Sequence, residues 1–213
     1  MVEMISKDSL GELIAEQLRR SIWKREIEFG ERLIENELSS KFDVSRNVIR
    51  DALRILEKDE MVVIEPRKGT YVSQFSNHDW QEIIDLRLMV ESYAFMKALP
   101  NMGEKEYKVL QDILQEMKHE KDNNDWEKLF DLDMKFHSYV VNLSGNSRVS
   151  KLYESIKVQI RTFLLYLDEY YTSSQAFYNE QEELMQALLT KDNESVEKKI
   201  RTHIEYVEGQ FLG

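Results

Sequence analysis

The chain has 213 residues, with two prolines, seven glycines, no cysteine and a formal net charge of −11. The lack of cysteine excludes disulfide frameworks, thiolate zinc sites and cysteine nucleophiles. The N-terminal residues lack the apolar run of a signal peptide, and no segment approaches the roughly 20 apolar residues of a membrane helix. We therefore expect a cytoplasmic protein with no membrane partner, built from long helices with few turns.

The negative charge is unevenly distributed along the chain. The first 73 residues carry 13 basic and 15 acidic side chains, a net charge of 13 − 15 = −2, whereas residues 74–213 carry 16 and 25. The N-terminal part is therefore close to neutral and can present a basic face to nucleic acid despite the acidic total. We expect two domains, at 1–75 and 76–213.

The N-terminal domain begins with three amphipathic segments. Apolar residues recur at helical spacing over 10–25, 33–42 and 46–60, and Ser45 is a suitable N-cap for the third helix. The period then changes, because MVVIE (61–65) and TYVSQF (70–75) are typical of strands and the PRKG between them is a turn signal. Three helices followed by a hairpin with a basic tip predict a winged helix-turn-helix.

The rest of the chain shows only helical periodicity. Six amphipathic helices in one domain predict an all-α antiparallel bundle of six or seven helices. The expected helices span 79–99, 104–121, 125–143, 147–168, 174–190 and 193–211.

Three arginines on the third helix are candidates for reading DNA. Arg46, Arg50 and Arg54 lie four residues apart and share one face, opposite the apolar stripe, and Ser45 and Asn47 lie at the N-terminus of the same helix. Arginine can bond guanine O6 and N7 together in the major groove. A solvated helix face would show the same spacing, but the preceding helix and the following hairpin favour the DNA-binding interpretation.

A second group of polar residues falls on the inward faces of the C-terminal helices. Asp133 and His137 are four residues apart in 125–143, and His203, Gln181 and Arg87 lie on the apolar stripes of three other helices. Buried polar groups cost free energy unless they are paired, so their convergence predicts a metal ion or a polar ligand. An aspartate with two neutral histidines suits zinc or another first-row divalent ion.

The N-terminal motifs resemble those of the GntR family of bacterial transcription regulators. The residues that carry the resemblance are Leu33, Glu35, Leu38, Val44, Ser45, Arg46, Arg50, Ala52, Leu53 and Gly69. The resemblance implies that Ser45, Arg46 and Arg50 contact DNA, that Asn36 does so from the second helix, and that Arg67, Lys68 and Gly69 place the wing near the minor groove. The chain departs from the family pattern at Phe29, Ser39, Val48, Asp51 and Glu60.

The C-terminal segments 85–92, 131–146 and 187–204 resemble the FCD effector domain of the same family. Many FCD domains bind a divalent metal through one aspartate and three histidines, which implies Asp133, His137 and His203 as ligands. The remaining histidine is replaced by Gln181, a weaker ligand. We expect one zinc, nickel or manganese ion per subunit, with Gln181 beside it, and a homodimer formed through the FCD domain.

The predicted function is that of a sequence-specific regulator, a repressor, which binds operator DNA and senses a small carboxylate metabolite. Arg87 and Arg161 are the candidate partners for the carboxylate. One alternative is a metal-independent sensor in which His137 and His203 contact the effector directly. A metal-dependent hydrolase is the other, but we expect no enzyme because no base or nucleophile accompanies the site.

Overall fold

The computed structural model describes residues 9–167 and 173–211. The chain divides into two compact units, Met1–Phe75 and Ser76–Gly213. Each unit is described below by itself.

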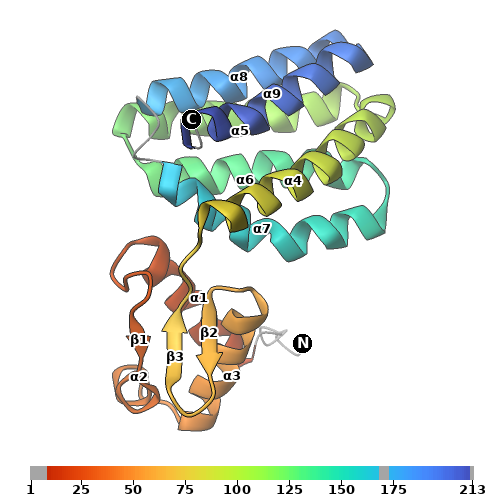
Figure 1. Ribbon diagram of the computed structural model, residues 1–213. Coiled ribbons are helices and arrows are strands. Elements are labelled where there is room, and N and C mark those ends of the chain that lie inside the picture. Colours follow the sequence, from red (N-terminus) through yellow and green to blue (C-terminus); the bar gives the residue numbers. More distant parts are fainter. Residues whose placement is uncertain (1–8, 168–172, 212–213) are drawn as a thin grey trace, which may run out of the picture. The chain divides into compact units, whose positions relative to one another are not determined.

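The N-terminal unit packs a small sheet against helices (Figure 1). Helix α1 lies against α3, and its buried residues Leu18 and Ile22 meet a core that includes Ile49, Leu53 and Leu56. The elements of this unit are α1 (Leu10–Trp23), β1 (Arg32–Leu33), α2 (Glu35–Phe42), α3 (Arg46–Lys58), β2 (Val62–Glu65) and β3 (Gly69–Val72).

The wing is a three-stranded antiparallel sheet in the order β1-β3-β2, and not a simple hairpin. The second helix was expected to begin at residue 33, but it begins at Glu35 because Arg32 and Leu33 pair with Tyr71 and Thr70 of β3. Two residues are too few to show the alternation by which a strand is recognised in a sequence. Strands β2 and β3 confirm the predicted hairpin.

The connection between α2 and α3 fixes the angle of the predicted DNA-reading helix. Asp43 ends α2 in the left-handed conformation, with φ 52°. The Ser39 hydroxyl donates to the Val44 carbonyl at 2.6 Å, and the Ser45 hydroxyl accepts from the Val48 amide at 3.4 Å. Helix α3 therefore begins at Arg46, and its apolar stripe faces the core while its arginines face outward.

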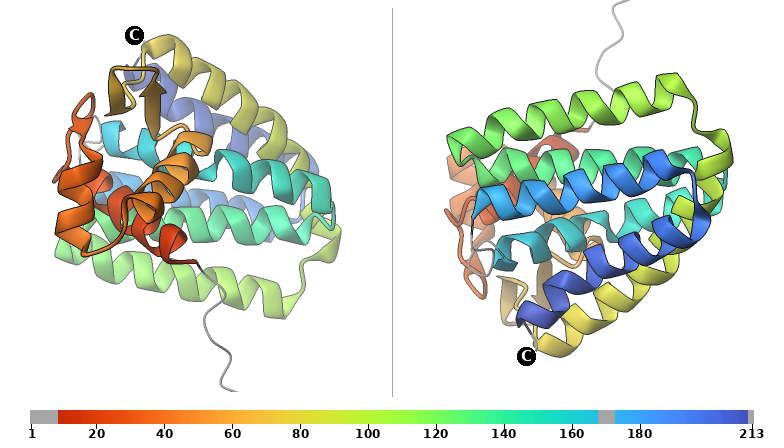
Figure 2. Two further views of the ribbon diagram at one scale, coloured as in Figure 1. Left: turned by 90° about the horizontal axis from the view of Figure 1, so that it is seen from below. Right: turned by 90° about the horizontal axis from the view of Figure 1, so that it is seen from above.

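The C-terminal unit contains all six predicted helices, side by side (Figure 2). Helix α4 lies against α6, α7 and α9, α5 lies against α6 and α8, and α8 lies against α9. These helices are α4 (Asn77–Ala98), α5 (Glu104–Asn123), α6 (Trp126–Leu143), α7 (Ser147–Leu167), α8 (Ser174–Thr190) and α9 (Asn193–Phe211), with a short 3-10 turn at Leu99–Asn101. Across the described residues, every helix is too short or too polar to cross a membrane.

Candidate functional site

Helix α3 exposes the side chains that the sequence singled out for DNA contact. Five of the predicted contacts are exposed on α2, at the N-cap or on α3, and they are Asn36, Ser45, Arg46, Asn47 and Arg50. Arg54 is also exposed and lies 3.7 Å from Asp51. The opposite face of α3 is fully buried, so this helix can present its arginines without disturbing the core.

The turn between β2 and β3 forms the basic tip of the wing. Arg67 and Lys68 are exposed there, and the Lys68 ammonium lies 2.8 Å from Glu65. The Arg32 guanidinium donates to the Lys68 carbonyl at 2.7 Å and fills the space beside Gly69, where an added Cβ would lie 3.0 Å from Arg32 Nε. Gly69 also has φ 128°, so the tip needs a glycine at this position.

The predicted polar cluster is present inside the C-terminal unit. Asp133 and His137 of α6 and His203 of α9 are buried, and each offers a ligand atom within 4.8 Å of the others. The Nε2 atoms of His137 and His203 are 3.2 Å apart, and His137 Nε2 is 3.6 Å from Asp133 Oδ1. Gln181 of α8 donates its amide to Asp133 Oδ1 at 2.8 Å. Three helices therefore bring these four side chains together.

Glu91 of α4 is a member of the cluster that the sequence analysis did not assign. It accepts a hydrogen bond from His137 Nδ1, and its other oxygen accepts from Arg87 Nε at 2.5 Å. With the proton on Nδ1, His137 directs the lone pair of Nε2 toward Asp133 and His203, which is the usual role of a carboxylate behind a metal-binding histidine. The four-residue spacing of Arg87 and Glu91 on the inward face of α4 was the available signal.

The charges around the cluster fit this tautomer. Burial alone would raise the pKa of Glu91, but Arg87 and His137 outweigh it and hold the pKa below its ordinary value. Burial, reinforced by His137, Arg87 and Lys199, holds the pKa of His203 well below its ordinary value. Glu91 is therefore an ionised acceptor at neutral pH, and the His203 ring is neutral and able to bind a metal.

The donor set of the cluster fits a divalent cation. Asp133 Oδ2 and Gln181 Oε1 are buried acceptors without a hydrogen-bond partner among the described residues, and they accompany the two imidazole nitrogens. Two nitrogens bound to one tetrahedral zinc ion lie about 3.3 Å apart, close to the observed separation of His137 and His203. Burial also raises the pKa of Asp133 above its ordinary value. His137 and Arg87 act in the opposite direction, but they do not outweigh the effect of burial. A metal ion would bind these unpartnered acceptor atoms.

The two predicted effector arginines differ in their surroundings. Arg87 is 3% exposed, and its Nη2 has no hydrogen-bond partner in the described part of the chain. Tyr153 of α7, which the sequence analysis did not single out, is also buried with an unpartnered hydroxyl there. Arg161 is engaged by α6, because Nε donates to Asp131 at 2.8 Å and Nη2 donates to the Glu127 carbonyl at 3.1 Å. Both effector assignments stay predictions.

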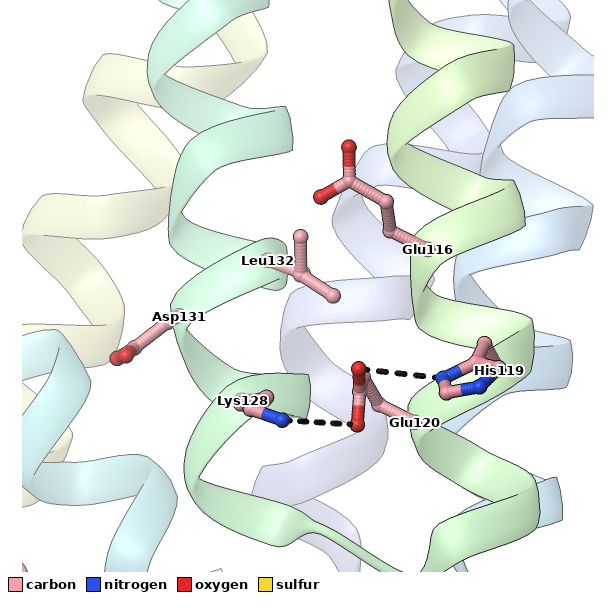
Figure 3. Close-up of a pocket in the computed structure, with 6 residues that line it drawn as sticks. All are labelled: Glu116, His119, Glu120, Lys128, Asp131 and Leu132. Carbon is pink, nitrogen blue, oxygen red and sulfur yellow. Dashed lines mark hydrogen bonds and ion pairs between the residues drawn. The ribbon is translucent and has the colours of Figure 1, made fainter.

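A surface hollow of about 270 Å³ lies between α5 and α6 (Figure 3). Glu120 is one of its lining residues and lies 3.3 Å from His119 and 3.4 Å from Lys128. The other lining residues are Glu116, Asp131 and Leu132. No member of the buried cluster lines this hollow, so the two features are separate.

Comparisons with known proteins identify both units. The profile of the bacterial regulatory proteins of the gntR family matches residues 10–72, and that of the FCD domain matches residues 82–206. The gluconate operon transcriptional repressor of Bacillus licheniformis is 28% identical over 97% of this chain and 86% of its own length, and that of Bacillus subtilis is 29% identical over 88% and 79%. The solved structure of a GntR transcriptional regulator from Rhodococcus sp. RHA1 has a TM-score of 0.82 and 25% identity, and it covers 97% of this chain and 99% of its own.

These matches confirm the predicted family and fold, and they are to transcription regulators and not to enzymes. The chain therefore belongs to the GntR family of bacterial regulatory proteins and is a transcription regulator of the type that carries an FCD domain.

Proposed function

We propose that this regulator is a repressor that binds operator DNA through α3 and the wing, and that its FCD domain binds a divalent metal and a small carboxylate. The observation that carries the sensing part is the buried cluster of Asp133, His137 and His203 with its unpartnered acceptors. The names of the two gluconate operon repressors support the sign of regulation. Gluconate is itself a carboxylate, and it is the first effector to test.

The proposed metal ligands are Asp133 Oδ2, His137 Nε2 and His203 Nε2. Gln181 Oε1 would be a weak fourth ligand, because an amide oxygen binds zinc, nickel or manganese less strongly than an imidazole. Glu91 keeps His137 in the tautomer that this requires. When bound, a divalent ion would supply an electrophilic centre that attracts a carboxylate oxygen.

Arg87 is the proposed anion partner beside the metal. Its Nη2 is buried and without a hydrogen-bond partner among the described residues, while Nε is held by Glu91. A buried guanidinium with free N–H groups favours a carboxylate through charge-assisted hydrogen bonds. Arg161 is a second proposed partner, although much of its guanidinium is already bound to α6.

The proposed homodimer uses the outer face of α4 and α7. The helices run antiparallel, because Trp80 packs on Phe163 with ring centroids 4.8 Å apart and the Asn146 amide lies 3.4 Å from the Tyr93 hydroxyl. Met89 of α4 is therefore level with Leu152 of α7, and both are exposed, by 66% and 43%. A second copy of the chain would cover this apolar surface, and two recognition helices would then reach two half-sites.

Metal content and thermal melting of protein purified without chelator test the sensing part. We expect one ion per subunit and a rise in melting temperature with zinc, nickel or manganese, because a bound ligand stabilises the folded state by about 2.7 kcal/mol at a hundredfold excess over its dissociation constant. The substitution Gln181→His should tighten metal binding. Gluconate should raise the melting temperature further only in the metal-loaded protein.

Metal-independent sensing is the second candidate function. The 3.2 Å distance between the Nε2 atoms of His137 and His203 favours it. A hydrogen bond between the two rings, with a proton on one Nε2, would explain this distance without a metal. If the protein carries no metal and no ion shifts its melting point, the metal proposal is wrong. The two imidazoles would then be reassigned as direct contacts of the effector.

A further inference from the structure

We propose that Glu35 sets the base specificity of this regulator by holding Arg50 in the orientation that reads DNA. Glu35 is the first residue of α2, and Arg50 lies one turn inside α3. Arg50 Nε is 3.1 Å from Glu35 Oε1 and 2.9 Å from Glu35 Oε2. The inference rests on the proposed role of α3 in DNA binding, and it adds a residue of α2 to the determinants of specificity.

The geometry leaves the reading end of the arginine free. Glu35 uses only the Nε–H of Arg50, and the two Nη groups have no hydrogen-bond partner among the described residues. These terminal N–H groups are the ones that can bond guanine O6 and N7 together. An arginine that is already held in one rotamer loses less conformational entropy when it binds a base than a free one does.

Arg50 differs in this respect from its neighbours on the same face. Arg54 lies 3.7 Å from Asp51, a distance too long for a hydrogen bond, and both side chains are mostly exposed. In the described structure, Arg50 is the arginine of this face that is hydrogen-bonded to α2. The position of its side chain therefore depends on how α2 and α3 pack against each other.

The experiment compares two glutamates of α2 that carry the same charge. A duplex is enriched from a random library by the full-length wild-type protein, and affinity for it is measured against a scrambled duplex of the same length. Glu35→Gln should lower the ratio of specific to non-specific affinity about five- to tenfold, as expected for partial loss of one base contact in each half-site. Glu37→Gln is the matched control, because Glu37 is exposed in the same first turn, and it should leave the ratio unchanged.

Two further variants separate the hydrogen bond from the charge. Glu35→Asp keeps the negative charge but shortens the side chain, and it should also lower the ratio. In an Arg50→Ala background, Glu35→Gln should have no further effect on it. Melting temperature and helicity are measured for every variant, and Glu35→Asp keeps the test valid if Glu35→Gln unfolds α2.

The outcomes distinguish this inference from the proposed function. If Arg50→Ala keeps the wild-type ratio, the assignment of α3 as the reading helix is wrong. If Arg50→Ala loses specificity while Glu35→Gln and Glu35→Asp behave like Glu37→Gln, only the role of Glu35 is overturned. A rise in specific affinity in Glu35→Gln would show that the ion pair competes with DNA, which would also overturn it.

Discussion

At the scale of single residues, the buried ion pair of α4 is the most consequential feature of the bundle. Arg87 and Glu91 are 3% and 0% exposed, and their charges are taken out of water together. Such a pair contributes little net stability, because the cost of desolvation offsets the attraction. Removing one partner should strongly destabilise the fold, because the other charge then stays buried without a counter-charge.

The substitution Glu91→Ala should lower the free energy of unfolding by about 3–5 kcal/mol, because it leaves Arg87 buried and unpaired. The double substitution Arg87→Met with Glu91→Met should recover part of this loss. Urea unfolding monitored by circular dichroism measures both. Asp112→Ala is the control, because it breaks the exposed pair with Lys108 at the same four-residue spacing, and it should cost only about 0.3–0.5 kcal/mol. A double variant as unstable as Glu91→Ala would contradict this explanation.

At the scale of elements, each unit orients its candidate site residues through the N-cap and the register of one helix. Ser45 is the N-cap of α3, whose arginines face outward, and Ser76 is the N-cap of α4, in which Arg87 and Glu91 face inward. If the helical register shifted by one residue, the face that carries these side chains would rotate by about 100° about the helix axis. The two caps therefore help to set the direction in which the candidate site residues face.

Arg46→Ala should lower affinity for the enriched duplex while the protein keeps its helicity. A bidentate contact of arginine with guanine contributes roughly 1–3 kcal/mol of discrimination, and a dimer would lose it in both half-sites. Arg201→Ala removes the same charge from an exposed position on α9 of the C-terminal unit and should leave affinity for both duplexes unchanged. Equal footprints for Arg46→Ala and the wild type would refute the assignment.

The cap of α4 makes the stability of the C-terminal unit depend on pH. Hydrogen bonds from the Ser76 hydroxyl and amide lower the pKa of Asp79 below its ordinary value of 3.8. A carboxylate with a lowered pKa stabilises the folded state above its ordinary pKa, and this contribution is lost as the pH falls through the lowered value. Asp79→Asn should therefore flatten the acid limb of a plot of stability against pH, measured by urea unfolding from about pH 5 to pH 2. An unchanged acid limb would show that the capping interaction is not formed in solution.

At the scale of the whole molecule, the proposed homodimer would determine how the regulator recognises an operator. A monomer presents one α3, whereas two half-sites on DNA require two copies at a fixed separation. The apolar surface around Met89, Tyr93 and Leu152 is the part of the C-terminal unit proposed to form that dimer.

Met89→Asp and Leu152→Asp should each shift the protein from dimer to monomer, because an unpaired charge in an apolar interface is costly to desolvate. Sedimentation velocity measures the shift, and affinity for the enriched duplex should fall with it. Leu189→Asp on α8 is the control, since Leu189 is similarly exposed at 40% but lies outside the proposed surface. Dissociation by the control alone would place the interface elsewhere.

The sequence predicted the helices, in which apolar residues repeat over many positions, better than it predicted contacts between distant parts of the chain. Each helix of the bundle was recognisable from repeated apolar residues, and the inward positions of Asp133, His137 and His203 followed from the same repeats. Strand β1 was missed because two residues carry no period. Its pairing depends on Tyr71 and Thr70, which lie almost forty residues further along the chain.

The partners of the site residues were the harder part to predict. The shared face of Arg87 and Glu91 was readable from the sequence, but the hydrogen bond from His137 to Glu91 joins two helices and depends on their packing. The same holds for Gln181, which was expected beside the metal and is found bonded to Asp133. Periodicity tells which way a side chain faces, and only tertiary structure tells what it meets there.

The buried cluster also contributes to the balance of charge inside the FCD domain. Arg87 and Arg161 contribute one positive charge each and Glu91 and Asp133 one negative charge each, so these four buried side chains sum to zero. A divalent ion held by Asp133, His137 and His203 would change this sum to +2. Binding of the ion would therefore make this interior more attractive to a carboxylate. Under the proposed function, the regulator would then respond more strongly to the acid while the metal is bound.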